Sequence, residues 1–317
     1  MSNLDYRALA VLDAVATAGS FDKAGLALGI TAADVSQRIK ALEDHCGRLL
    51  IVRGQPALPT GLGLRLIAHF HHVRLMEASL DIDLGHSVSM PQIILAMDAD
   101  SLATWFPDCL PALLAPPRCQ LDVRLAGRDD ALRMLADGTV FGCVAGDIGT
   151  APPPAGVSVT ALGTLRYVCV ATPVFAGHWF GDGFSADAVA LAPAVSSDQQ
   201  LLARFLERQL AVRGAFPHHT LPDTAALRGC ISNGMAYGLM PQRQAAAGLA
   251  SELLVDLLPG CTLEVPLSWH AWNLETPFTR LLTEQIVSAG RAFLEPDPRS
   301  NLPGPVIYRG DRLPMTI

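Results

Sequence analysis

The sequence predicts a helical N-terminal domain built around a helix-turn-helix, joined by a long helix to a larger α/β domain. Three observations support this fold class. The first 46 residues hold three short amphipathic helical patterns, with a glycine-containing turn before the third. One long helical pattern follows, from Gly61 to about Leu84. From Gln92 onward, short apolar runs alternate with amphipathic helices, which is typical of parallel sheets covered by helices.

Local start and stop signals bound the first two helices. Apolar residues at three- and four-residue spacing predict a helix from Asp5 to Ala18, which Gly19 ends. Ser20 is a suitable N-cap for a second helix, from Phe21 to Leu28. Gly29-Ile30 then forms the turn.

The third helix carries a capping signal and two distinct faces. Thr31 is its predicted N-cap, and Asp34 stands three residues further on, as in a capping box. The expected buried stripe consists of Val35, Ile39 and Leu42. The polar side chains left on the outside are Ser36, Gln37, Arg38 and Lys40.

A two-stranded wing and a long linker helix are expected next. Leu49 to Val52 is a short β-like run, and Gln55 to Pro59 supplies the return strand. Thr60 caps the long helix, whose apolar stripe suggests a coiled-coil-like dimer contact. The stripe consists of Leu62, Leu66, Phe70, Val73, Met76 and Leu80. Residues 85–91 read as a linker.

The domain limits follow from these patterns. We expect a helical domain with a helix-turn-helix and a wing over residues 1–60, a linker helix and hinge over 61–90, and an α/β domain over 91–295. Within the α/β domain, a first β-α-β-α-β cycle is followed by a second. Residues 296–317 hold several prolines without periodicity and are predicted to be a loosely attached tail.

Composition limits the possible functions. The 317-residue chain has a net charge of −7, but both of its lysines lie in the first 65 residues, where seven basic residues face six acids. The N-terminal part can therefore present a local basic face. No signal peptide and no apolar run of about 18 residues is visible, so we expect a cytoplasmic protein without a membrane span. The seven cysteines lack C-x-x-C spacing, so we expect neither a zinc site nor a disulfide framework. We expect no other cofactor either.

No catalytic constellation is visible. The sequence lacks G-x-S-x-G, H-E-x-x-H and a P-loop, so an enzyme is not expected. The histidines 69, 71 and 72 are not spaced to share one helical face, and a metal site is not predicted there. Two alternatives stay open at this point, a solute-binding protein without a DNA role and an enzyme that uses the α/β cleft.

The N-terminal motifs resemble those of LysR-type transcriptional regulators. T-A-A-D-V-S-Q-R-I-K-A-L-E at 31–43 resembles their recognition helix, and F-D-K-A-G-L-A-L-G-I before it resembles their second helix. L-L-I-V-R and P-T-G-L-G resemble the wing and the start of the linker. Two departures are Asp34, where a small apolar residue is usual, and the wing from Gln55 to Pro59, which lacks a second arginine.

Further segments resemble one branch of that family, the lysine- and arginine-responsive ArgP/LysG regulators. They are D-Y-R-A-L-A-V-L-D-A-V at 5–15, D-A-D-S-L-A-T-W-F at 98–106 and S-W-H at 268–270. The resemblance implies a winged helix-turn-helix and two Rossmann-like subdomains of periplasmic-binding-protein type. Subdomain I would span about 91–164 and 270–295, and subdomain II about 165–269. It also implies a homodimer or homotetramer that binds double-stranded DNA and acts on RNA polymerase.

The resemblance also assigns roles to the polar residues. Gln37 and Arg38 would read bases, because Gln pairs with adenine and Arg with guanine through two hydrogen bonds each. The remaining expected DNA contacts are Ser20, Thr31, Ser36, Lys40, Arg53 and Thr60.

The expected effector site lies beyond the carboxyl ends of the strands, where open α/β sheets bind ligands. The candidates are Asp98, Asp100, Ser101, Ala145, Gly146, Asp147, Ser196, Ser197, Asp198, Asp223 and Thr224. The accumulated acids favour a cationic ligand such as lysine or arginine. Some of these acids, Asp98 and Asp223 among them, could equally be helix caps.

Overall fold

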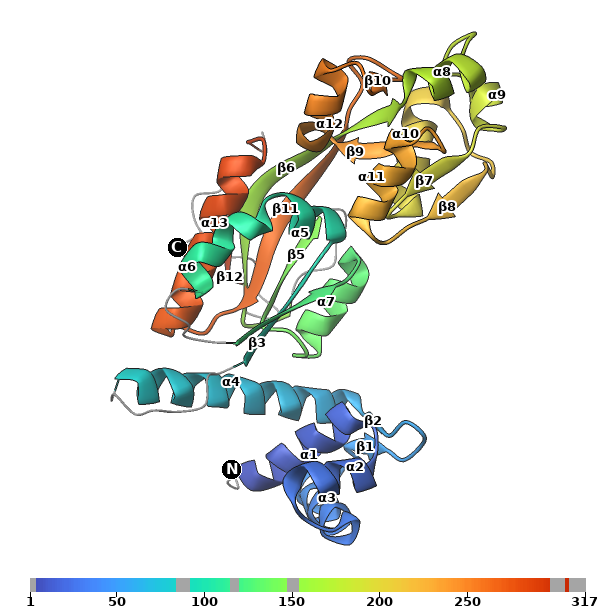
Figure 1. Cartoon of the computed structure of the whole chain (residues 1–317). Helices are drawn as coiled ribbons and strands as arrows, with labels where there is room; N and C mark the ends of the chain where they lie inside the picture. The colour runs from blue at the N-terminus through green and yellow to red at the C-terminus, as the bar shows by residue number, and fades with distance from the viewer. Residues whose placement is uncertain (1–3, 84–91, 115–119, 147–153, 297–305, 308–317) are drawn as a thin grey trace.

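A computed structural model describes residues 4–83, 92–114, 120–146, 154–296 and 306–307. Figure 1 shows a small helical domain on one side of a long helix, α4, and a larger α/β domain on the other side. Asp147, the linker at 85–91 and most of the proline-rich tail lie outside the described residues.

The N-terminal domain has the predicted order of elements. They are α1 (Tyr6–Ala18), α2 (Phe21–Leu28), α3 (Ala32–Cys46), β1 (Ile51–Val52), β2 (Leu58–Pro59) and α4 (Gly61–Asp83). The capping box between Thr31 and Asp34 is present, and Gly29 ends α2 in the left-handed conformation. Ser20 precedes α2, but its side chain makes no capping hydrogen bond. The predicted stripe of α3 is buried against α1, since Val35, Ile39 and Leu42 share one core with Leu9 and Leu12.

Helix α4 serves both domains. Ile67 and Phe70 belong to the core of the N-terminal domain, whereas Leu75 belongs to the main core of the α/β domain. Further along the predicted stripe, Met76 and Leu80 are 43% and 59% exposed. The stripe therefore packs within the chain at Phe70, whereas Met76 and Leu80 lie exposed to solvent.

The α/β domain begins with β3 and ends with β12. Its first part holds β3 (Gln92–Met97), α5 (Ala99–Thr104), the 3₁₀ turn η1 (Phe106–Cys109), α6 (Leu110–Leu114), β4 (Gln120–Leu125), α7 (Arg128–Ala136) and β5 (Gly142–Gly146). Then follow β6 (Val157–Ala171), α8 (Pro173–Trp179), α9 (Ala186–Val189), β7 (Ala194–Ser196), α10 (Gln199–Leu210), β8 (His218–Thr220), α11 (Thr224–Ser232), β9 (Tyr237–Pro241) and α12 (Gln242–Ala250). The last elements are β10 (Val255–Asp256), β11 (Leu263–Trp272), α13 (Pro277–Phe293) and β12 (Val306–Ile307).

One mixed sheet runs through both subdomains, in the order β4-β3-β5-β11-β6-β9-β7-β8. β3 pairs in parallel with β4 and β5, and β7 pairs in parallel with β8 and β9, as the alternating pattern predicts. The centre is different, because β6 and β11 are long antiparallel strands that connect the two halves. The parallel order predicted for each β-α-β-α-β cycle is therefore found within the two halves of the sheet, and the antiparallel centre was not predicted.

The two crossing strands define how the subdomains join. β11 pairs with β5 of subdomain I from Leu267 onward, while β6 pairs with β9 of subdomain II from Tyr167 onward. The register between β6 and β11 shifts between Leu267 and Ser268, which marks the crossing. The subdomain limits expected at 164/165 and 269/270 fall inside these two strands. None of the helices that the structure describes is long and apolar enough to cross a membrane.

Candidate DNA-binding and effector-binding sites

The exposed face of α3 carries the residues expected to meet DNA. Gln37, Arg38 and Lys40 are exposed, and Ser36 is half-buried at the edge of the same face. Because Val35, Ile39 and Leu42 occupy the buried side, this polar face is fixed by packing. Such a face, with a bidentate amide and a guanidinium next to each other, has the chemistry to read base edges in a major groove.

The N-terminus of α3 is closed by its own side chains. The Thr31 hydroxyl donates to Asp34 Oδ2 at 2.7 Å and accepts from the backbone N–H of Asp34 at 3.1 Å. The Thr31 hydroxyl, together with the Thr31 backbone N–H that donates to the same Oδ2 at 3.2 Å, holds the pKa of Asp34 below its usual value. The hydroxyl proton of Thr31 is thus used within the helix cap.

The wing and the linker are tied to the helical core. The Arg53 guanidinium lies 5.3 Å from the centroid of the Phe21 ring, at the start of α2. Within the described residues Arg53 forms no ion pair, so its charge is available to a phosphate. The Thr60 hydroxyl donates to the Leu49 carbonyl at 2.9 Å and accepts from the Gly63 N–H at 3.1 Å. Thr60 therefore holds the start of the linker helix against the segment that leads into β1.

Asp98 follows β3 and caps α5. Its carboxylate accepts from the Ser101 N–H at 2.8 Å and from the Ser101 hydroxyl at 2.7 Å. Asp98 and Ser101 therefore hydrogen-bond to each other. Asp98 is a helix cap, which is the alternative that the sequence left open.

Asp100 joins the two subdomains. It belongs to α5 of subdomain I, yet its carboxylate accepts from the Tyr167 hydroxyl at 2.8 Å and from the Thr224 hydroxyl at 3.4 Å, both of subdomain II. Asp100 is buried, with 7% of its surface exposed. Burial, followed by the charge of Asp98, raises the pKa of Asp100 to about 6, although the hydrogen bonds from Tyr167 and Thr224 oppose the shift.

A third acid, Asp198, belongs to subdomain II. It is exposed and caps α10, and its charge also acts to raise the pKa of Asp100. Among the residues that the structure describes, no Lys or Arg forms an ion pair with Asp98, Asp100 or Asp198. Carboxylates that repel Asp100 and have no cationic partner favour a cationic ligand beside it.

The remaining predicted residues that the structure describes lie at strand ends or helix starts. Ser196 is buried at the end of β7 and hydrogen-bonds to His218 Nε2 at 2.8 Å, and Ser197 follows it half-buried. Asp223 caps α11 through the Ala226 N–H. Ala145 and Gly146 end β5, where they pair with β11. Asp147 cannot be placed because it lies outside the described residues.

Sequence reasoning missed Tyr167 and His218. Tyr167 lies in a strand that reads as apolar core, and nothing local indicates that its hydroxyl reaches Asp100, which is 67 positions away. The single phenol in the run L-R-Y-V-C-V-A was the only available signal, since a buried Tyr hydroxyl needs a partner.

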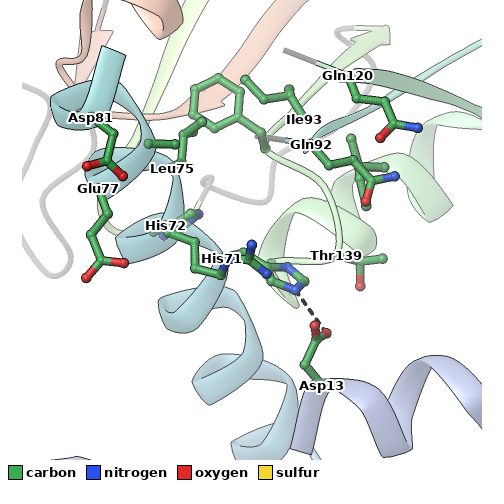
Figure 2. Close-up of a pocket in the computed structure, with 15 residues that line it drawn as sticks. Asp13, His71, His72, Leu75, Glu77, Asp81, Gln92, Ile93, Gln120 and Thr139 are labelled. Carbon is green, nitrogen blue, oxygen red and sulfur yellow. Dashed lines mark hydrogen bonds and ion pairs between the residues drawn. The ribbon is translucent and has the colours of Figure 1, made fainter. Parts of the chain in front are cut away.

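Helix α4 contacts both domains through two neighbouring histidines, His71 and His72 (Figure 2). Both line a polar hollow of about 380 Å³. His71 Nε2 lies 2.9 Å from Asp13 Oδ1 of α1. His72 packs against Trp272 of β11, with 5.0 Å between the ring centroids. Nearby, a Cβ on Gly138 would lie 1.8 Å from that of Ala68, so only glycine permits this approach of α4. The linker helix is thus fitted to subdomain I as well as to α1.

A winged helix-turn-helix joined through a linker helix to a bilobed α/β domain defines the class of ligand-responsive DNA-binding regulators. Comparison with known families gives the particular family. The profile described as "Bacterial regulatory helix-turn-helix protein, lysR family" matches residues 6–64, and "LysR substrate binding domain" matches residues 89–291. The chain belongs to the LysR family of transcriptional regulators.

Individual relatives agree with this assignment. The HTH-type transcriptional regulator ArgP of Pseudomonas aeruginosa (strain UCBPP-PA14) is 38% identical over 289 residues, which cover 90% of this chain and 95% of the relative. The crystal structure of ArgP from Mycobacterium tuberculosis is similar with a TM-score of 0.81 and 33% identity, covering 93% of this chain and all of that one. Full-length LysG from Corynebacterium glutamicum, solved with bound effector Arg, has a TM-score of 0.75 and 31% identity, covering 92% and 100%.

Proposed function

We propose that this regulator senses a basic amino acid, lysine or arginine, in the cleft between its two subdomains. The observation that supports this most is the group of three carboxylates, Asp98, Asp100 and Asp198, which has no cationic partner among the described residues. The bound Arg in the related LysG structure agrees with a cationic effector.

In this proposal Asp100 is the principal anchor for the side-chain cation of the effector. Its carboxylate is already oriented by Tyr167 and Thr224, so little ordering is needed on binding. The first turns of α5, α10 and α11 supply the surroundings, with Ser101, Ser197 and Thr224 at their starts. The lining is completed by Ala145, Gly146, Ser196 and Asp223.

On the DNA side, Gln37 and Arg38 contact base edges, and Ser36, Lys40, Arg53 and Ser20 contact the backbone. Thr31 and Thr60 contribute by holding α3 and the linker in place, because their hydroxyls are engaged within the chain. The regulator works in the cytoplasm as a homodimer or homotetramer and acts on RNA polymerase. Effector binding shifts the angle between the subdomains, which changes the spacing of the DNA-binding domains.

Isothermal titration calorimetry with lysine, arginine and glutamate tests the effector. We expect binding of lysine or arginine and none of glutamate, whose side chain carries a carboxylate where theirs carry a cation. In Asp100→Asn the affinity should fall roughly 10- to 100-fold, because one charge-assisted hydrogen bond is lost. Glu284→Gln, on α13, is the matched control. Failure of both basic amino acids to bind would overturn the effector assignment and leave the DNA-binding role intact.

A further inference from the structure

A second hollow, of about 420 Å³, lies in subdomain II between α11 and α12. Both helices pack on β6 and β9 through one shared core that contains Leu227, Ile231 and Met240. Arg228 and Ser232 stand one turn apart on α11, and Gln244 and Gly248 stand one turn apart on α12; all four line the hollow. The turn after α12 closes it with Glu252 and the two leucines that follow.

Opposite charges line this hollow without pairing. Arg228 and Glu252 are both exposed, and within the described part of the chain neither takes part in an ion pair. A ligand that carries a carboxylate and an ammonium could satisfy both at once, since guanidinium groups suit carboxylates and carboxylates suit ammonium groups.

One further feature points to a ligand. The side-chain oxygen of Gln244 is buried and has no hydrogen-bond partner among the described residues. A buried acceptor of this kind calls for a donor. The φ of +58° at Glu252 belongs to the end of α12, where the Glu252 N–H donates to the Leu249 carbonyl and the Leu254 N–H donates to the Gly248 carbonyl.

Apolar side chains form another part of the lining of the hollow. Met240 and Leu254 are buried at the base, whereas Leu253 is 69% exposed at the rim. A large apolar side chain is held open to solvent beside a charged pair, an arrangement that suits a ligand with one apolar branch.

We propose that this hollow is a second ligand site, which binds a free α-amino acid with an apolar side chain. The α-carboxylate pairs with Arg228. The ammonium donates to Glu252 and, after a rotation of the amide that brings its buried oxygen into the hollow, to Gln244. The apolar side chain covers Met240 and Leu253. The site is separate from the proposed effector site, because none of the residues that line the hollow is among the proposed effector contacts. The two sites share helix α11, so occupancy of one bears on the other.

Calorimetry on the full chain with L-leucine as the probe tests the site. We expect saturable binding in the wild type and in Asp100→Asn, whose cleft site is impaired. Binding should weaken at least 10-fold in Arg228→Gln, which loses the carboxylate partner. Arg243→Gln is the control, because Arg243 is on α12 but stacks on Phe293 outside the hollow. N-acetyl-L-leucine and L-leucinamide, which lack the ammonium or the carboxylate, should both bind more weakly than leucine.

Three outcomes would overturn the proposal. They are the absence of leucine binding up to about 10 mM, near the weakest affinities that calorimetry resolves, equal binding by Arg228→Gln, and loss of leucine binding in Asp100→Asn. The last result would place leucine in the cleft. Because lysine binding is measured separately on the same variants, failure of this site is distinguishable from failure of the effector assignment.

Discussion

At the scale of single residues, Asp100 is held charged in a place that disfavours charge. Burial and its acidic neighbours raise its pKa to about 6, from an ordinary value of 3.8. Ionised Asp100 therefore contributes less to the stability of the folded chain than protonated Asp100 does. Stability linked to Asp100 is present below about pH 4 and is lost as the pH rises through 6. A ligand cation would offset this cost by pairing with the carboxylate.

Asp100→Asn should consequently stabilise the free protein at neutral pH. The amide keeps an acceptor for Tyr167 and removes the buried charge, so we expect the free energy of unfolding at pH 7.5 to rise by about 2 kcal/mol. At pH 4 the variant and the wild type should unfold alike. Urea unfolding at the two pH values measures this, and a variant that is destabilised at pH 7.5 would contradict the assigned cost of the charge.

At the scale of elements, the fit of α4 against subdomain I has its own pH dependence. Burial, together with the charges of His71 and His69, lowers the pKa of His72 from 6.5 to about 4. The unfolded chain therefore binds this proton before the folded chain does. The stability linked to His72 is complete above pH 6.5 and is lost as the pH falls toward 4.

His72→Phe should remove that loss while it keeps an aromatic ring against Trp272. We expect the melting temperature of the variant to fall less than that of the wild type between pH 7 and pH 5. His178→Phe, at an exposed position on α8, serves as the control and should follow the wild type. Parallel pH profiles for His72→Phe and the wild type would show that His72 is not held neutral by the α4 contact.

At the scale of the whole molecule, local signals predicted the N-terminal domain better than the α/β domain. Helix bounds, the Thr31–Asp34 capping box and the buried stripe of α3 depend on residues close in sequence, so the printed sequence determines them. β6 and β11 pair across about 100 positions, and their antiparallel crossing has no local signature. The sheet was therefore predicted only within each half.

The proposed effector site shows the same difference between features set by the local sequence and features set by contacts between distant segments. Acids at strand ends were predictable because strand ends and helix caps are local features, and Asp98, Asp198 and Asp223 are all caps. That Asp100 is the buried member, and that Tyr167 and Thr224 approach it from the other subdomain, depends on how β6 and α11 are placed. This could not be derived from spacing along the chain.

The central claim is that the polar face of α3 binds duplex DNA. Fluorescence anisotropy with DNA from upstream of the chain's own gene, over a range of salt concentrations, tests it most directly. The double variant Arg38→Glu, Lys40→Glu should lose roughly 100-fold or more in affinity, and its salt slope should fall by about two. The control with Arg204→Glu and Arg208→Glu, on α10, should bind as the wild type does. Unchanged affinity and salt slope in the α3 variant would contradict the account.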